Sequence, residues 1–381
     1  MKKEEKKYCE LPWEELRRLY NIPSYDAMTE GWFSLRRPLS YNRYFMTITG
    51  KRSTGKSTNT SLYILLDYLI RGKGWVYTRR TKDESELTGP TWFNNAVGII
   101  NRYITKEEHR VVVEYKGGKY FVNGKLAGYM IPLSLQQKVK SADFSTCDWI
   151  VYDEFIVFEG GSYLGGANNP IKEYRALMSL RETVDRAIDR PHRNEVKIIC
   201  LGNNESLFNP VYMGLGADRF IRMDTHYLAP KGEEWVCVQL NPDDATKAED
   251  YKESIGYKLA DQRTREYAYE NKSKEESASK VFVKKLTHTM RELCNLHFDG
   301  FNMILCADFR QGYVYVKSGY RQGLDDYALT FEDHRPNYML TLTGGSEGYL
   351  ATLKTFYNSG NVWFENMRCK YCIDNFYKYV I

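Results

Sequence analysis

The sequence predicts two folded parts, an α/β domain followed by a smaller α+β domain. At 381 residues, with 43% hydrophobic and 27% charged residues, the chain has an ordinary folded composition and exceeds one typical domain. The segment from Phe45 to Thr78 has the pattern strand, Gly-rich turn, helix, strand, which is a βαβ unit and requires a parallel sheet. After about Tyr227, a long charged stretch separates this pattern from a second group of strands.

Composition and charge exclude several classes of protein. The mixed composition is unlike that of a collagen, a coiled coil or a disordered chain. The 54 Lys and Arg residues against 49 Asp and Glu give a net charge of +5, which permits contact with nucleic acid but does not predict it. Eight scattered cysteines and no recognisable signal peptide favour a reduced, cytosolic chain. The apolar stretches are too short and interrupted to predict a membrane span or a membrane partner.

Residues 1–40 are expected to form an N-terminal extension, because a solvated charge run is followed by one short surface helix from Trp13 to Tyr20. Residues 41–228 are expected to form the α/β domain. Its first strand is Phe45–Thr49, and leucines from Leu62 to Leu69 recur at helical spacing. A hairpin turning at Gly117-Gly118 is inserted into it. The other strands expected here are Trp75–Thr78, Val111–Tyr115, Tyr120–Val122, Trp149–Tyr152 and Val196–Leu201.

The second half of the chain changes character. Residues 229–280 are rich in charge and poor in aliphatic side chains, and we expect a partly helical linker there. Residues 281–381 are expected to form the small α+β domain. Its predicted elements are the strands Phe301–Asp308, Tyr313–Val316 and Tyr338–Leu342 and a helix from Leu350 to Tyr357.

The turn after the first strand matches the phosphate-binding pattern G-x-x-x-x-G-K-[ST]. Its residues are Gly50, Lys51, Arg52, Ser53, Thr54, Gly55, Lys56 and Ser57, with Thr58 as a further donor. The glycines let backbone N–H groups curl around phosphate oxygens, Lys56 neutralises the β and γ phosphates, and the Ser57 hydroxyl binds Mg²⁺. A plain strand-to-helix turn is the alternative, and it leaves the complete match unexplained.

An acidic pair, Asp153 and Glu154, ends the apolar strand that begins at Trp149. A phosphate-binding loop needs a carboxylate on a neighbouring strand to hold the metal, and Asp153 supplies it. Glu154 is one residue further along, and we interpret it as the general base that activates the attacking water. Surface decoration is the alternative for such a pair alone. Together, the loop and the acids predict hydrolysis of ATP or GTP.

Two further features suit an ATPase made of several subunits. The segment from Ile171 to Arg190 is predicted to be a helix whose apolar stripe leaves Arg175 and Arg186 free, so that an arginine can reach a neighbour's γ phosphate. An exposed helical arginine is also commonly just solvated. The strand through Ile198 ends at Asn203, a position suited to sensing the nucleotide.

The chain resembles the genome-packaging ATPases of small protein-primed podophages of the phi twenty-nine type. The resemblance rests on the phosphate-binding loop, the acidic pair, Arg79-Arg80 after the second strand, and the hairpin-to-strand segment from Tyr120 to Ser134. Within that segment the blocks Gly124-Lys125-Leu126-Ala127-Gly128 and Pro132-Leu133-Ser134 are more specific than the loop alone.

The resemblance implies a P-loop, additional-strand, conserved-glutamate (RecA-like) ATPase domain that uses ATP and Mg²⁺. It implies a ring, commonly a pentamer, that docks in the host cytoplasm on the portal vertex of an empty capsid, in some cases through a packaging RNA, and drives double-stranded DNA inward. By position, Lys56 resembles the Walker lysine, and Asp153 and Glu154 resemble the metal aspartate and catalytic glutamate. Arg186 and Lys140 resemble basic residues offered across the subunit interface, and Asn203 falls at the coupling motif.

For residues 281–381 the resemblance implies a ribonuclease H-like domain that has lost cleavage and contacts nucleic acid. A two-metal nuclease needs at least three clustered carboxylates, and the spacing of Asp308, Asp325 and Asp374 matches no nuclease motif. The candidate phosphate contacts are Lys280, Lys284, Lys285 and Arg291, although a solvated charged helix explains them equally well. Two alternatives remain open: a terminase with an active nuclease, and a nucleotide-dependent switch protein.

Overall fold

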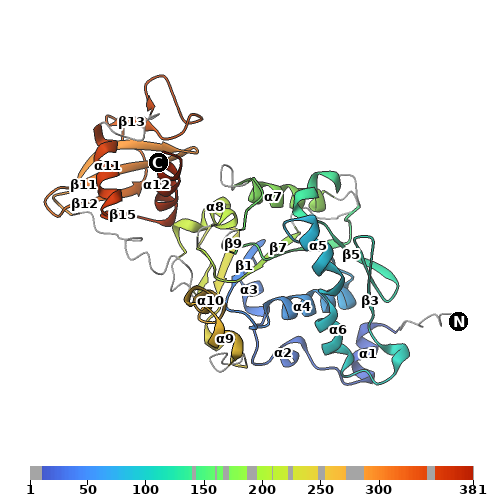
Figure 1. Cartoon of the computed structure of the whole chain (residues 1–381). Coiled ribbons are helices and arrows are strands. Elements are labelled where there is room, and N and C mark those ends of the chain that lie inside the picture. The colour runs from blue at the N-terminus through green and yellow to red at the C-terminus, as the bar shows by residue number, and fades with distance from the viewer. Residues whose placement is uncertain are drawn as a thin grey trace. The chain divides into compact units, whose positions relative to one another are not determined.

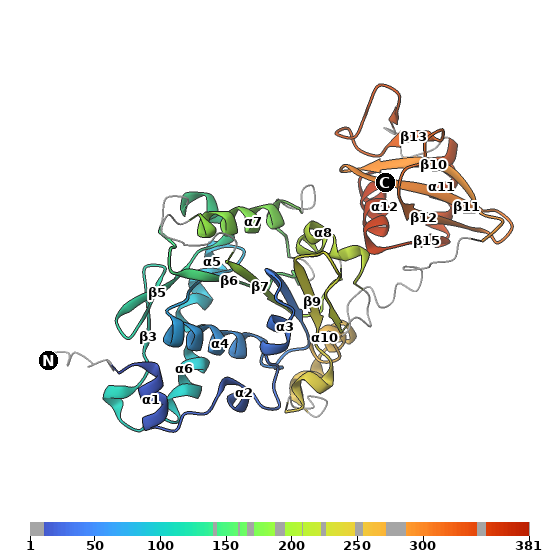
Figure 2. The same ribbon diagram turned by 180° about the vertical axis from the view of Figure 1, so that it is seen from behind.

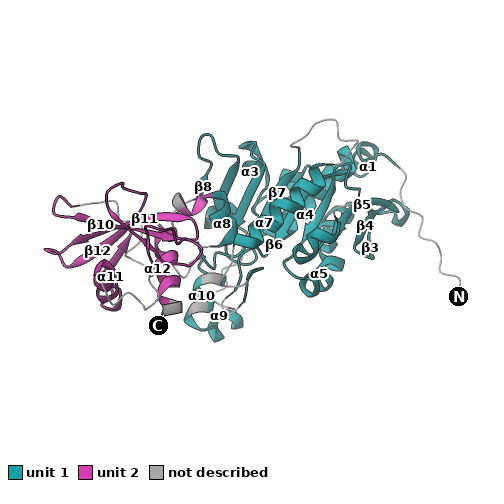
Figure 3. Cartoon of the chain, turned by 90° about the horizontal axis from the view of Figure 1, so that it is seen from above, with its two compact units in different colours: residues 1–215, 223–273 teal, residues 216–222, 274–381 magenta. Residues whose placement is uncertain are grey.

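The computed structural model describes residues 11–139, 143–158, 161–165, 171–186, 195–207, 209–221, 226–247, 254–271, 287–340 and 348–380. The chain divides into two compact units (Figure 3). Unit 1 comprises residues 1–215 and 223–273, and unit 2 comprises residues 216–222 and 274–381. The larger unit is a mixed α/β fold with a mostly parallel sheet, which is the class that the sequence predicts.

A nine-stranded sheet organises the described part of unit 1 (Figure 1). The neighbours β5, β2, β6, β7, β1 and β9 run parallel in that order, whereas β3, β4 and β8 extend the two edges with antiparallel pairs. The strands are β1 (Phe45–Thr49), β2 (Gly74–Thr78), β3 (Val113–Lys116), β4 (Lys119–Val122), β5 (Lys125–Met130), β6 (Cys147–Asp153), β7 (Lys197–Gly202), β8 (Tyr227–Leu228) and β9 (Trp235–Gln239). The predicted hairpin is β3–β4, and β5 then enters the parallel sheet beside β2.

Helices cover both faces of this sheet (Figure 2). On one face, α4 buries Leu62 and Leu65 in a cluster with Met46, Ile48 and Trp75 of the strands. On the other face, α7 packs against β6 and α8. The helices are α1 (Trp13–Leu19), α2 (Tyr25–Met28), α3 (Arg36–Ser40), α4 (Lys56–Arg71), α5 (Lys82–Thr88), α6 (Asn94–Asn101), α7 (Ile171–Asp185), α8 (Pro210–Leu215), α9 (Ile255–Leu259) and α10 (Gln262–Ala268). Short 3-10 turns join several of them.

The N-terminal segment is an integral part of unit 1 where the structure describes it, in contrast to the expected extension. Trp13, Leu16 and Tyr25 are buried in the same cluster as α4. The backbone N–H of Phe33 also donates to the carbonyl of Thr54 at 3.1 Å. The reason is apolar burial: these side chains complete a face of α4 that would otherwise meet water.

The expected linker also contributes to the sheet. Trp235–Gln239 forms β9 directly beside β1, with Cys237 opposite Thr47, and all five of its residues are buried. Charged residues on both sides hide this short apolar strand in the sequence. The helical expectation holds for α9 and α10, whereas residues 272–280 lie outside the described part of the chain.

Unit 2 is built on a six-stranded mixed sheet in the part that the structure describes. Its order is β14-β13-β10-β11-β12-β15, with an antiparallel meander from β10 to β12. α11 and α12 pack their apolar residues, including Leu353 and Phe376, into one cluster with this sheet. The elements are β10 (Arg291–Phe298), β11 (Phe301–Asp308), β12 (Tyr313–Ser318), β13 (Asp325–Ala328), β14 (Met339–Leu340), α11 (Gly348–Asn358), β15 (Val362–Phe364) and α12 (Met367–Val380). Among the described residues, no helix is both long and apolar enough to span a bilayer.

Candidate functional site

A polar pocket of about 330 Å³ lies in unit 1, where β1, β6 and β7 end. Parallel neighbours bring their carboxyl ends to one edge of a sheet, so the segments that follow these strands meet there. The lining residues are Arg52, Ser53, Thr54, Gly55, Lys56, Ser57, Thr58, Arg79, Asp153, Glu154, Leu201, Gly202 and Asn203. The fold therefore gathers the loop, the acidic pair and Asn203 around one space.

The loop from Gly50 to Ser57, called here the glycine loop, joins β1 to the first turn of α4. Ser53 and Gly55 have left-handed backbone conformations, with φ of 60° and 89°. At Gly50 an added Cβ would lie 2.9 Å from the Cβ of Leu240, so the loop passes too close to the end of β9 for a side chain. The sixteen-residue α4 that follows directs its free N-terminal N–H groups toward the pocket.

The Lys56 amine is enclosed by the glycine loop. Its Nζ donates to the carbonyls of Gly50 at 2.9 Å and Lys51 at 2.7 Å, and it lies 3.5 Å from the Asn203 side-chain oxygen. Burial lowers the pKa of Lys56 to about 7, although the nearby Asp153 acts in the opposite direction. Because the pKa lies near neutral pH, an anion that enters the pocket would favour the charged form of Lys56.

The acidic pair faces the pocket because the backbone changes hand at its second member. Alternation along β6 would turn Asp153 and Glu154 to opposite faces of the sheet. Glu154, however, has φ of 57°, in the left-handed region that costs a non-glycine residue about 1–2 kcal/mol. Both carboxylates consequently bind one guanidinium: Arg79 donates to Asp153 at 3.0 Å and to Glu154 at 2.8 Å.

Arg79 also lines the pocket, although the sequence analysis assigns it no role in the site. Its place follows from strand register: β2 and β6 are parallel neighbours and Thr78 pairs with Tyr152, so Arg79, the residue after β2, reaches the level of Asp153. Burial acts to lower the pKa of Arg79, but Asp153 and Tyr77 outweigh it and raise the pKa, which keeps the guanidinium charged. Tyr77 also donates to Asp153 at 3.2 Å.

The structure describes one of the two basic residues that the family resemblance assigns to the subunit interface, and that residue, Arg186, is not part of this pocket. Arg186 is exposed just beyond the end of α7, where its Nε donates to the carbonyl of Glu182 at 3.1 Å. It does not line the pocket of its own chain. Lys140 lies outside the described residues.

In unit 2 the candidate nuclease carboxylates do not converge. Asp308 is a turn anchor: one oxygen accepts from the hydroxyls of Thr287 and Thr289, and the other accepts from two backbone N–H groups of the β11–β12 turn. The hydroxyl donors lower the pKa of Asp308 to about 2. Asp374 instead accepts from Tyr357 on α11. Within the described ranges, no three His, Cys, Asp or Glu residues are grouped as metal ligands.

The candidate phosphate contacts of unit 2 can be placed only in part. Arg291 is exposed at the start of β10. Lys280, Lys284 and Lys285 lie outside the described residues. Nucleic-acid binding by these residues therefore stays a prediction.

Comparison with known proteins gives consistent matches along most of the chain. Residues 30–381 match the family model described as podovirus DNA encapsidation protein (Gp16). The DNA packaging proteins of Bacillus phages phi29 and PZA are 26% and 27% identical to this chain over 338 residues, which is 88% of this chain and 93% of theirs.

Solved structures share the fold at lower identity. A chain of the bacteriophage phi29 genome packaging motor assembly superposes with a TM-score of 0.67 at 23% identity, over 92% of this chain and 98% of that one. A chain of the phi28 gp11 DNA packaging motor gives 0.60 at 15% identity, with the same shares of both chains. These matches confirm the resemblance that the sequence motifs indicate.

Proposed function

Since the chain belongs to the family of podovirus DNA encapsidation proteins (Gp16), its role is DNA packaging, and we propose that hydrolysis of ATP in the pocket beside the glycine loop drives it. One observation carries the proposal. The glycine loop, the two carboxylates and Asn203 come from three separate strands and line the same pocket. That combination serves phosphoryl transfer, in which the protein positions groups and stabilises charge.

The residues of the pocket fit a Mg²⁺–nucleotide complex. Three cationic side chains, Arg52, Lys56 and Arg79, line it and suit a polyanion. The Ser57 hydroxyl and the Asp153 carboxylate are hard oxygen donors of the kind that Mg²⁺ prefers. When bound, Mg²⁺ would neutralise charge on the β and γ phosphates.

The chain's own groups divide the work. The glycine loop and Lys56 bind and orient the phosphates. Glu154, whose side chain is 60% exposed, accepts the proton of the attacking water at its carboxylate. Asn203, next to the Lys56 amine, is placed to respond to the phosphates and pass their state to β7.

We infer a ring as the working form. An exposed Arg186 outside its own pocket is suited to act on the nucleotide of a neighbouring copy, with Lys140 as a second trans-acting cation. The matched phi29 chain comes from a packaging motor assembly. By that likeness we propose a pentameric ring around double-stranded DNA at the capsid portal, in the host cytoplasm, with a packaging RNA as a further partner.

The finer fold assignments are also proposals. In unit 1, β7 lies between β1 and β6, which is the extra strand expected of an additional-strand, conserved-glutamate ATPase. In unit 2, the mixed sheet with its antiparallel meander supports a ribonuclease H-like fold. Because Asp308 is fully engaged in a turn, we propose that unit 2 contacts nucleic acid through Arg291 and its neighbours without cutting it.

Displacement of a triplex-forming oligonucleotide from long duplex DNA tests translocation. We expect the full-length chain to displace it with ATP and Mg²⁺, and the Glu154→Gln variant to bind DNA without displacing it. Nucleotide-dependent DNA binding without displacement by the wild type would favour a switch protein. Cleavage of the duplex that disappears in Asp308→Ala would favour an active terminase.

A further inference from the structure

A buried ion pair lies behind the pocket, on the side of β2 opposite Arg79. Arg80 donates to both carboxylate oxygens of Glu173, at 2.8 Å and 3.2 Å. The two side chains are only 6% and 0% exposed. A pair this deeply buried is costly to desolvate, so stability alone explains it poorly.

The Glu173 carboxylate is saturated with donors. Besides Arg80, it accepts from the Tyr152 hydroxyl at 2.5 Å and from the backbone N–H of Leu164 at 2.8 Å. Tyr152 belongs to β6, Leu164 to the segment after it, and Glu173 to the first turn of α7. One carboxylate thereby ties together three stretches of chain that flank the acidic pair.

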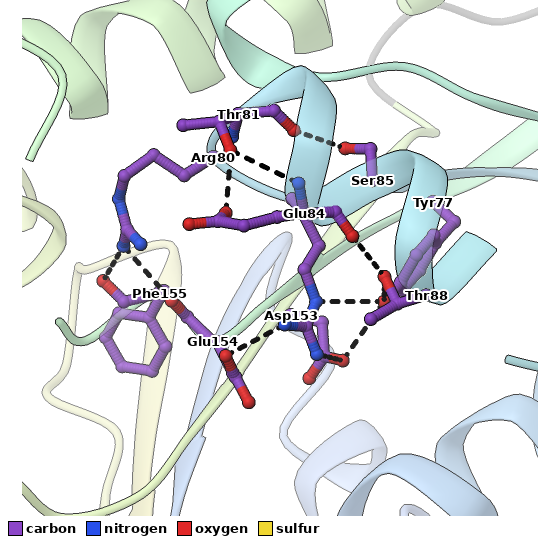
Figure 4. A network of polar contacts seen from close by, with 10 residues as sticks. Tyr77, Arg80, Thr81, Glu84, Ser85, Thr88, Asp153, Glu154 and Phe155 are labelled. Carbon is purple, nitrogen blue, oxygen red and sulfur yellow. Dashed lines mark hydrogen bonds and ion pairs between the residues drawn. The ribbon is translucent and has the colours of Figure 1, made fainter. Parts of the chain in front are cut away.

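Arg80 also donates to the backbone at the acidic pair. Its Nη2 donates to the carbonyl of Glu154 at 3.1 Å and to that of Phe155 at 3.2 Å (Figure 4). The Phe155 N–H donates to the carbonyl of Leu201 on β7 at 3.1 Å. The peptide group between Glu154 and Phe155 is therefore hydrogen-bonded at both its carbonyl and its N–H, at the point where the chain leaves β6.

We propose that Arg80 and Glu173 are positioning residues for Glu154. By clamping the carbonyls of Glu154 and Phe155, Arg80 maintains the left-handed turn that directs the Glu154 carboxylate into the pocket, and Glu173 fixes Arg80 in place. Because Glu173 belongs to α7, its ion pair also connects Arg80 to that helix, and Arg186 directly follows the helix. The inference rests on the proposed ATPase function of the pocket.

The decisive variant replaces both charges, Arg80→Met together with Glu173→Leu. Replacing a buried ion pair by apolar residues of similar size commonly preserves stability, yet here it removes the donor to the two carbonyls. We expect a folded protein with a somewhat lower thermal midpoint, because the Tyr152 hydroxyl and the Leu164 N–H lose their acceptor. We expect a KM for ATP within a few-fold of the wild type and a kcat lower by about a hundredfold, as small misplacements of reacting groups produce. The matched control is Lys82→Ala, two residues after Arg80. It removes an exposed ion pair with Glu86 and should change neither KM nor kcat.

A folded double variant with wild-type kcat would overturn the proposal. If the double variant does not fold, Arg80→Lys decides: it keeps the positive charge but lacks the planar fork, so kcat should fall, and an unchanged kcat refutes the clamp. Hydrogen exchange supplies a readout without catalysis. The peptide covering residues 153–158 should exchange faster in the variants than in the wild type, and the glycine loop should not. An inactive wild type would refute the ATPase function alone, whereas unchanged exchange refutes the positioning role.

Discussion

At the residue scale, the site depends on the left-handed backbone of Glu154 and on the buried amine of Lys56. Asp153 and Glu154 are adjacent, and alternation would separate their side chains. The left-handed Glu154 reunites them, and Arg79 offsets the repulsion between the two carboxylates. The acidic pair could be predicted from the sequence because its chemistry is local. The guanidinium between the acids was missed because its contacts depend on the register of two strands.

We predict opposite phenotypes for the two central residues. Lys56→Ala should lose binding of Mg²⁺–ATP, because the amine enclosed by the loop is the charge that meets the phosphates. Glu154→Gln should bind ATP as the wild type does but hydrolyse it at least about a hundredfold more slowly, since the amide cannot accept the proton. Equilibrium binding and steady-state turnover measure the two effects. Turnover within a few-fold of the wild type in Glu154→Gln would remove Glu154 from its role.

Nucleotide binding should depend on pH through Lys56. With a pKa of about 7 in the free protein, the amine is charged below that pH and neutral above it. Bound phosphates raise this pKa, so binding takes up a proton and the affinity should fall as the pH rises above 7, by up to about tenfold per pH unit. Titration calorimetry in two buffers with different ionisation enthalpies measures the uptake.

The control for this titration is Lys56→Arg, whose guanidinium stays charged over the same range. Any residual affinity of this variant should be independent of pH. Proton uptake that is equal in both proteins, or a flat profile in the wild type, would assign the pH dependence to another group.

At the scale of elements, apolar periodicity predicts the strands and helices that have a continuous apolar stretch or stripe. β1 and β11 agree with their expected bounds, and β6 and β7 differ by one or two residues at each end, whereas α4 begins at Lys56, well before the leucine stripe that predicts it. The sequence analysis does not predict β9 or β10: β9 is a short strand between charged stretches that pairs with the distant β1, and β10 contains charged and polar residues such as Arg291, Glu292 and Asn295. The sequence predicts a surface helix at α1, although Trp13 and Leu16 on one side of it are buried in the cluster that contains α4.

Helix α1 offers a matched pair for testing that burial. Leu16 is 3% exposed and Leu19 is 57% exposed on the same helix. Leu16→Ala should lower the free energy of unfolding by about 2–4 kcal/mol, and Leu19→Ala should change it by less than about 0.5 kcal/mol. Urea unfolding of the full chain measures both. If both variants lower the free energy of unfolding by the same small amount, the N-terminal helices do not contribute to the core of unit 1.

The end of α7 tests the ring. Arg186→Ala alone should lose hydrolysis, and mixing it with Lys56→Ala subunits should restore part, because the arginine would serve a neighbour's pocket. Lys172→Ala, which removes an exposed cation from the same helix, is the control and should hydrolyse ATP normally. Mixed rings that assemble but show no activity beyond each mutant alone would place Arg186 outside the reaction.

At the scale of the whole molecule, two units share one chain, but their boundaries differ from those expected. The chain enters unit 2 at residues 216–222, returns to complete the sheet of unit 1, and then forms the rest of unit 2. A linear scan of composition assigns each stretch to one domain and cannot find such an exchange. The α/β class, the pocket and the family were predictable, because they rest on local motifs.

The central claim is that this pocket hydrolyses ATP to move duplex DNA. Steady-state ATP turnover by the purified wild-type chain, with and without long duplex DNA, tests it most directly. We predict turnover that DNA stimulates and that Glu154→Gln abolishes in both conditions. Turnover that DNA leaves unchanged, or that persists in Glu154→Gln, would contradict the claim.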